Sequence, residues 1–97
     1  MLIALVPFAL KPDVSEDALL DLSERFEKEF VAEQDGIVRR VLLKDGDSYA
    51  DLVFFRDQES IDRVMEAERT SPVCAEFFSA MASDGSYRLY QVLKSYD

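Results

Sequence analysis

The side chains of this sequence that could do chemistry are carboxylates, arginines and phenols. The chain has 20 acidic and 11 basic residues, four tyrosines, one cysteine and no histidine. Without histidine, a Ser-His-Asp triad, a Cys-His pair and a histidine-ligated zinc or haem are excluded. Cys74 alone cannot form a thiolate cluster, and the three glycines stand too far apart for a phosphate-binding loop. We therefore expect no metal site and no cofactor.

One pair of charged residues falls within two strand-like runs, 37–44 and 49–56. Asp45-Gly46 follows the first run, and Asp-Gly between apolar runs is a strong hairpin signal. If the hairpin closes on a two-residue Asp45-Gly46 turn, Arg40 faces Asp51 across the strands. The pair has two interpretations, which stay open here: a polar anchor in a ligand cavity, or a cross-strand ion pair worth about 0.2–1 kcal/mol.

The first half of the chain must place this hairpin beside a strand and a helix. Residues 1–10 form an apolar run of strand length, in which Pro7 predicts a bulge or an early strand end. Asp13 is a candidate N-cap for an amphipathic helix whose apolar residues recur at three- and four-residue steps. Asp35-Gly36 is predicted to end that helix, with the glycine as a left-handed cap.

The second half repeats the alternation of helix and strand. Asp57 is predicted to cap a second helix, which Ser71-Pro72 interrupts and restarts. Asp84-Gly85 closes it, and residues 87–96 form the last strand. The β-α-β-β-α-β order predicts one α+β, ferredoxin-like domain over residues 1–97, with a four-stranded antiparallel sheet and two helices on one face.

The predicted strands are apolar on both faces. In the third strand, for example, Leu52 and Phe54 alternate with Val53 and Phe55. Two helices cover only one face, and the other would leave an apolar patch of a size that soluble monomers rarely expose. A second copy stacked sheet to sheet is the simplest cover, so we expect a homodimer through the open sheet face.

Composition narrows the partners and the compartment. The net charge of −9 argues against nucleic acid and against anionic membrane surfaces, because both bind through Lys and Arg. No run reaches the roughly 20 apolar residues of a membrane span. The apolar start lacks a basic leader and a cleavage site, and a single cysteine suits a reducing compartment. We expect a cytoplasmic protein whose partner is a small molecule or another protein.

Three stretches resemble the dimeric α/β-barrel superfamily, and within it the antibiotic biosynthesis monooxygenase-like domains. They are the opening strand running into Lys11-Pro12, the run Leu52-Val53-Phe54-Phe55-Arg56-Asp57, and Glu68-Arg69-Thr70-Ser71-Pro72 followed by Phe77-Phe78. The resemblance implies a dimer with a pocket between sheet and helices in each subunit. The activities it implies are cofactor-independent oxygenation of phenols or quinols and haem degradation.

The resemblance also suggests site residues. Where active members often carry Trp near the end of the third strand and Asn before it, this chain has Phe55 and Asp51. Glu68 stands where they often have His. Because the chain has no Trp, His or Asn, haem degradation is not expected. A cofactor-free oxygenase needs a base and a donor that steadies an anion. The catalytic candidates are therefore Asp51, Arg40 and Glu68, and the candidates for contacts with substrate are Tyr49, Phe55 and Arg88.

Two classes of function remain. The first is a monooxygenase-like enzyme on a phenolic or quinol substrate, and the second is a non-catalytic dimer that binds an apolar ligand or a partner. An open pocket with convergent polar groups would favour the first, and a pocket filled by Phe and Leu would favour the second. An RNA-recognition domain shares the strand order, but the aromatic run 49–55 lacks the leading Lys/Arg-Gly of such domains, carries Asp51 and lies in an acidic chain.

Overall fold

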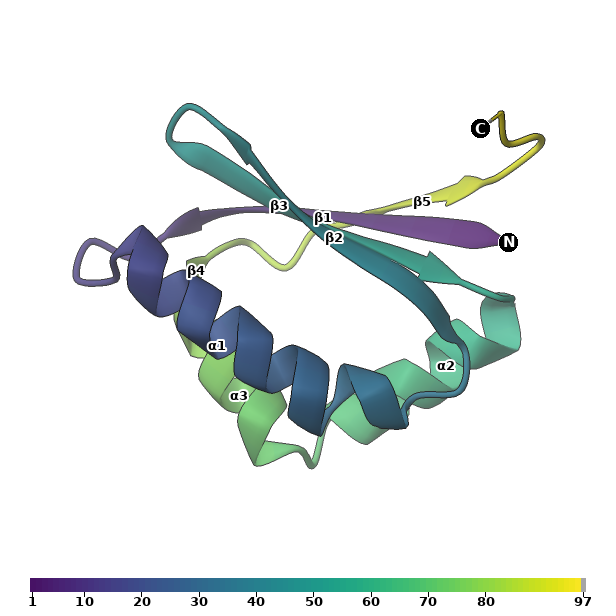
Figure 1. The fold of residues 1–97 in the computed structure, drawn as a ribbon, viewed down its shortest axis with the longest axis horizontal. Coiled ribbons are helices and arrows are strands. Elements are labelled where there is room, and N and C mark those ends of the chain that lie inside the picture. Colours follow the sequence, from purple (N-terminus) through teal and green to yellow (C-terminus); the bar gives the residue numbers. More distant parts are fainter. Residues whose placement is uncertain (97) are drawn as a thin grey trace.

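The computed structural model describes residues 1–96 as an antiparallel sheet with helices packed on one face (Figure 1). The order of elements is the predicted ferredoxin-like α+β order, with the second helix split in two. In chain order the elements are β1 (Leu2–Leu10), α1 (Glu16–Glu29), the 3-10 turn η1 (Val31–Glu33), β2 (Ile37–Asp45), β3 (Ser48–Phe55), α2 (Gln58–Glu68), α3 (Pro72–Ser79), β4 (Met81–Ala82) and β5 (Arg88–Gln91).

The sheet has five strands rather than four, because two short strands share the outer edge of β1. The path runs β2-β3-β1, and β1 then pairs with β5 at its start and with β4 at its end. The last strand is shorter than the predicted 87–96. The backbone N–H of Val92 donates to the carbonyl of Met1 at 3.0 Å, next to the first residue of β1.

Pro7 lies inside β1 without the predicted bulge or early end, and it pairs in register with Ala50 of β3. On the other edge of β1, the Lys11 N–H donates to Ala80 and the Met1 carbonyl accepts from Val92. Alternate residues of a strand turn their backbone groups to the same edge, so Pro7 faces the gap between β4 and β5. Its missing N–H costs no ladder hydrogen bond there.

The turn of the β2–β3 hairpin lies one residue further along the sequence than predicted. Asp45 pairs with Ser48, so the turn is Gly46-Asp47, and Gly46 takes a φ of 61° at the position that a II′ turn gives to glycine. The predicted direct pairing of Arg40 with Asp51 is therefore wrong: Arg40 pairs with Val53, and Asp51 with Leu42. The register differs by two residues, which keeps both side chains on the same face of the sheet.

Three side-chain caps start the helices. The predicted caps Asp57 and Ser71 are confirmed, since they accept hydrogen bonds from the backbone N–H groups of Ser60 and Cys74. At the first helix the prediction of Asp13 is wrong. Ser15 caps α1 by accepting from the Ala18 N–H, because residues 11–14 form a turn of their own.

Gly36 does not serve as the predicted left-handed cap. The helix α1 ends at Glu29, and the chain passes through η1 before it reaches β2. Positive φ angles occur at Gly46 and Gly85, not at Gly36. Instead, a Cβ at Gly36 would lie 2.1 Å from the Cβ of Ser60. The glycine is thus needed for the close approach of α2 to the start of β2.

The core lies between the helices and the inner face of the sheet. Phe77, Leu19 and Cys74 are fully buried, and the rings of Phe26 and Phe77 stack with centroids 4.5 Å apart. Cys74 is a free thiol, as the sequence led us to expect. Among residues 1–96, none of the helices is long and apolar enough to cross a membrane.

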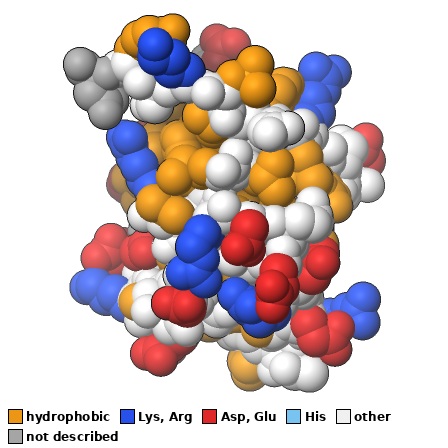
Figure 2. Space-filling view, turned by 90° about the vertical axis from the view of Figure 1, so that its right-hand side faces the viewer, with side chains coloured by type: hydrophobic (Ala, Val, Ile, Leu, Met, Phe, Trp, Pro, Cys, Tyr) orange, Lys and Arg blue, Asp and Glu red, His pale blue; other side chains and the backbone are white. Residues whose placement is uncertain are grey.

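The outer face of the sheet carries no helix (Figure 1). On the side that Figure 2 shows, hydrophobic side chains gather over the sheet half of the molecule and most charged side chains lie over the helical half. Tyr90 and Leu43 are 46% and 41% exposed. The strand register places these apolar side chains on the open face: Ile3, Leu5, Val41, Leu43, Leu52, Phe54 and Tyr90.

Candidate functional site

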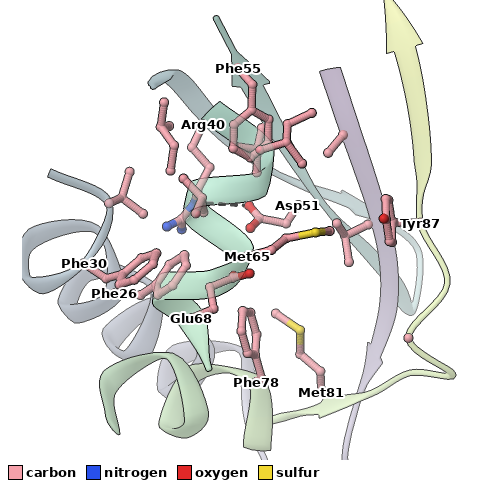
Figure 3. A pocket seen from close by; sticks show the side chains of 18 of the residues that line it. Phe26, Phe30, Arg40, Asp51, Phe55, Met65, Glu68, Phe78, Met81 and Tyr87 are labelled. Carbon is pink, nitrogen blue, oxygen red and sulfur yellow. Dashed lines mark ion pairs between the residues drawn. The ribbon is translucent and has the colours of Figure 1, made fainter. Parts of the chain in front are cut away.

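A cavity of about 430 Å³ lies between the inner face of the sheet and the helices. Its volume is in the range of pockets that hold small molecules. Most of its wall is apolar, from residues such as Phe26, Phe55 and Met65. The polar side chains in the wall are those of Arg40, Asp51, Glu68, Ser83 and Tyr87. Figure 3 shows Arg40 and Asp51 from the sheet and Glu68 from α2 around one space.

Arg40 is held on four sides. Its Nε lies 3.1 Å from Asp51 Oδ1, and its Nη1 lies 3.5 Å from Glu27 Oε1. Its Nη2 donates to the hydroxyl of Ser23. The guanidinium carbon also lies 5.0 Å from the ring centroid of Phe26, within the range of a cation–π contact. With a side chain only 5% exposed, Arg40 is a fixed cation in the cavity wall.

Two polar atoms of this pair have no hydrogen-bond partner within residues 1–96. They are Arg40 Nη1, a donor, and Asp51 Oδ1, an acceptor, and both are fully buried. The Nε–Oδ1 contact is an ion pair by distance but is not aligned as a hydrogen bond. Buried polar groups are nearly always satisfied in folded proteins. A donor and an acceptor of one ion pair that both lack a hydrogen bond are thus a feature that a ligand could complete.

Asp51 is more basic than an ordinary aspartate. Burial raises its pKa from the usual 3.8 to about 6, because the carboxylate is removed from water. The charge of Arg40 acts in the opposite direction and Glu27 raises the pKa slightly. The cost of desolvation outweighs the ion pair, so Asp51 can take up a proton near neutral pH.

Glu68 is the last residue of α2, and its carboxyl group points into the cavity (Figure 3). Burial, and to a lesser degree the charge of Asp51, raise its pKa to about 7. Among residues 1–96 no side chain forms a hydrogen bond or an ion pair with the Glu68 carboxylate. The cavity wall therefore holds two carboxylates with different surroundings, one beside a guanidinium and one without a cation.

The six candidate residues from the sequence separate into two groups. Arg40, Asp51, Glu68 and Phe55 all line the cavity. Tyr49 lies outside it: its hydroxyl donates to Glu16 at 2.9 Å, and its ring stacks on Phe8 near the hairpin turn. Arg88 also lies outside, because it pairs with Leu5, whose side chain points to the open face.

Tyr87 lines the cavity, and the sequence reasoning did not single it out from the other phenols. The alternation of side chains along a strand could have found it. Because Arg88 and Tyr90 share the open face, a side chain just before Arg88 points to the helical side. Within the described residues 1–96, no three His, Cys, Asp or Glu side chains gather as metal ligands would.

Comparison with family models and with curated proteins gave no match. Solved structures do match over nearly the whole chain. SnoaB, a cofactor-independent oxygenase from Streptomyces nogalater, superposes with a TM-score of 0.77 at 18% identity, covering 97% of this chain and 94% of SnoaB. An antibiotic biosynthesis monooxygenase superposes with a TM-score of 0.73 at 15% identity, covering 97% of this chain and 100% of that one.

The chain shares its fold with these two structures. Rv0793 from Mycobacterium tuberculosis is a further similar structure, with a TM-score of 0.70 at 16% identity over 99% of this chain and 98% of its own. The resemblance drawn from the sequence is thus confirmed for the fold. Identities of this size do not carry an activity across. The function of this chain must therefore be argued from its cavity.

Proposed function

We propose that the cavity binds a small phenolic molecule and that the protein is a cofactor-independent, monooxygenase-like enzyme acting on it. The observation that carries the proposal is that two buried atoms of the Arg40–Asp51 ion pair, the donor Arg40 Nη1 and the acceptor Asp51 Oδ1, have no hydrogen-bond partner within residues 1–96. A phenolic hydroxyl accepts one hydrogen bond and donates another. One hydroxyl could therefore satisfy both atoms, while its ring lies against the apolar wall of the cavity.

The same two residues supply the chemistry that such a reaction needs. Asp51 accepts the phenolic proton, and its pKa of about 6 leaves it ionised but basic at neutral pH. Arg40 steadies the phenolate that forms. The phenolate then donates electrons to O₂. One oxygen atom enters the ring and the other leaves as water, so that phenol and O₂ give quinone and water. The substrate supplies all four electrons.

Asp51 rather than Glu68 is assigned as the base, because Asp51 lies beside the cation that would hold the anion. Phe55 is assigned to the apolar contact with the ring. The non-catalytic alternative from the sequence receives less support, since the cavity is open rather than filled by Phe and Leu side chains.

The proposal includes a homodimer that forms through the open sheet face. The apolar side chains on that face, including the half-exposed Tyr90, support it. Leu52→Glu places a charge at the centre of this face and should give a monomer in sedimentation velocity. Leu20→Glu, on the exposed side of α1, is the matched control and should stay dimeric. A wild-type monomer at micromolar concentration would contradict the dimer. A cytoplasmic setting is part of the proposal and suits the free Cys74.

Binding is tested by a thermal-shift screen of phenols and quinols at fixed protein concentration, because the melting temperature of a dimer depends on concentration. A ligand at 100 times its dissociation constant adds about 2.7 kcal/mol to the free energy of unfolding. For a domain of this size, this corresponds to roughly 10 °C or more. The hits are then assayed for oxygen uptake.

The base is tested with Asp51→Asn, which keeps the shape and one acceptor oxygen. We expect phenol binding to be largely kept and oxygen uptake to fall by about 10²-fold or more. Asp21→Asn, on the exposed side of α1, is the control. Unchanged uptake in Asp51→Asn would remove Asp51 as the base. Phenol binding with no uptake by the wild type would favour the non-catalytic alternative.

A further inference from the structure

We propose that the ligand of this cavity carries a protonated amine as well as a hydroxyl, and that the amine binds the carboxylate of Glu68. The inference rests on the proposed function for the position of the hydroxyl at Arg40 and Asp51. It is carried by the balance of charge in the cavity wall and by the aromatic residues that line the same cavity as Glu68.

The charges in the wall do not balance. The ionisable Arg, Asp and Glu side chains that line the cavity are Arg40, Asp51 and Glu68, which are one cation and two anions. Arg40 is already flanked by two carboxylates, Asp51 at 3.1 Å and Glu27 at 3.5 Å. Glu68, on the helical wall, has no cation beside it within residues 1–96. A ligand that brings one positive charge would supply the missing counterion.

The aromatic part of the cavity wall also suits a cation. Phe26, Phe30, Phe78 and Tyr87 line the same cavity as Glu68. Aromatic faces attract ammonium groups, most strongly where water is excluded. The protein already uses this attraction, since the guanidinium of Arg40 lies 5.0 Å from the ring centroid of Phe26 and 5.4 Å from that of Phe77.

The same balance of charge disfavours two other types of ligand, uncharged phenols and phenols that carry a carboxylate. Burial and the charge of Asp51 raise the pKa of Glu68, which means that its carboxylate is poorly stabilised in the cavity. An uncharged phenol would leave that carboxylate without a partner. A ligand with a carboxylate would add a third anion to a wall with one cation. We therefore expect affinity to follow the order amine, neutral phenol, carboxylate.

Four probes with the same ring test this order by calorimetry at pH 7.5. They are 4-(2-aminoethyl)phenol, 4-propylphenol, 3-(4-hydroxyphenyl)propanoate and 2-phenylethylamine. We expect the aminoethylphenol to bind about tenfold more tightly than 4-propylphenol, and the propanoate to bind about tenfold more weakly than 4-propylphenol. Phenylethylamine, which lacks the hydroxyl, should bind more weakly than the aminoethylphenol.

Glu68→Gln should remove the preference for the amine and leave the affinity for 4-propylphenol within about twofold. Glu66→Gln, two residues earlier on α2 and exposed, is the matched control and should change neither affinity. The comparison of the four probes on the wild type tests the inference even if Glu68→Gln does not fold.

The outcomes separate the inference from the proposed function. If 4-propylphenol binds as tightly as the aminoethylphenol, or if Glu68→Gln binds the amine as the wild type does, the inference is overturned and the phenol site stands. If phenylethylamine binds as tightly as the aminoethylphenol, the amine site stands and the hydroxyl site falls. If none of the four probes binds, both are overturned.

Discussion

Replacing Asp51 by asparagine should change how the stability of the protein depends on pH. In the wild type the pKa of Asp51 rises from 3.8 in the unfolded chain to about 6 in the fold, mainly because the carboxylate is buried. Each pKa unit corresponds to about 1.4 kcal/mol. Ionising Asp51 in the folded protein thus costs about 3 kcal/mol more than ionising it in the unfolded chain.

The sign of the pH dependence of stability follows from whether the folded or the unfolded protein binds the Asp51 proton more tightly. Between pH 4 and pH 6 the folded protein holds the Asp51 proton and the unfolded chain has lost it, so the free energy of unfolding falls as pH rises. The loss is complete above about pH 7. The amide introduced by Asp51→Asn does not titrate. The difference in free energy of unfolding between the variant and the wild type should therefore shift by about 3 kcal/mol in favour of the variant from pH 4 to pH 8. The charged groups that face Asp51 are Arg40, Glu27 and Glu68, and all three remain in the variant.

Urea unfolding at a series of pH values, at one protein concentration, measures this difference. With an m-value of about 1.5 kcal/mol/M, 3 kcal/mol corresponds to a change of about 2 M, from pH 4 to pH 8, in the difference between the urea midpoints of the variant and the wild type. Asp21→Asn, whose side chain is exposed on α1, should run parallel to the wild type. Parallel curves for Asp51→Asn and the wild type would refute the reasoning, because they would mean that the Asp51 carboxylate is solvated in the folded protein.

Three further changes test the packing that holds the cavity open. Gly36→Ala should lower the free energy of unfolding by about 2 kcal/mol or more, since its Cβ would lie 2.1 Å from that of Ser60. Adding Ser60→Gly should recover part of the loss, and no recovery would contradict the clash. Ser71→Ala removes the cap of α3 and should cost about 1 kcal/mol, measured by urea unfolding. Phe77→Ala empties a fully buried position and should cost about 3–5 kcal/mol; a cost below about 1 kcal/mol would show that the site collapses.

The sequence was sufficient for the order of elements and for the face that carries the site, but not for the register of the hairpin. Asp45-Gly46 marks a turn without saying which two residues occupy its centre. The register differs from the predicted one by two residues. Because side chains alternate between the two faces with a period of two, a difference of two residues changes which residues pair across the strands but leaves each side chain on the same face of the sheet. Arg40 and Asp51 therefore still meet, along a diagonal rather than directly across the strands.

Other features depend on contacts that are distant in the sequence. Gly36 looks like a helix cap, and its actual neighbour is Ser60, which lies in another element. The choice between Arg88 and Tyr87 depends on where β5 pairs with β1, and that pairing brings together the two ends of the chain. Local patterns contain neither contact. The cavity was expected only from the family resemblance and not from the local patterns, because its volume depends on how far the helices stand from the sheet.

The gap between β4 and β5 has a consequence for how this protein can change over evolution. Ser83, Gly85 and Tyr87 form part of the cavity wall. Hydrogen bonds within this segment hold it, from the Gly85 N–H to the Ser83 hydroxyl and from the Ser86 N–H to the Asp84 carboxylate. The two short strands on either side are paired to β1 independently. Insertions, deletions and substitutions in this segment can therefore reshape the cavity without shifting the sheet. A scaffold of this kind can acquire new ligand specificities in five consecutive residues while Arg40 and Asp51 keep their places.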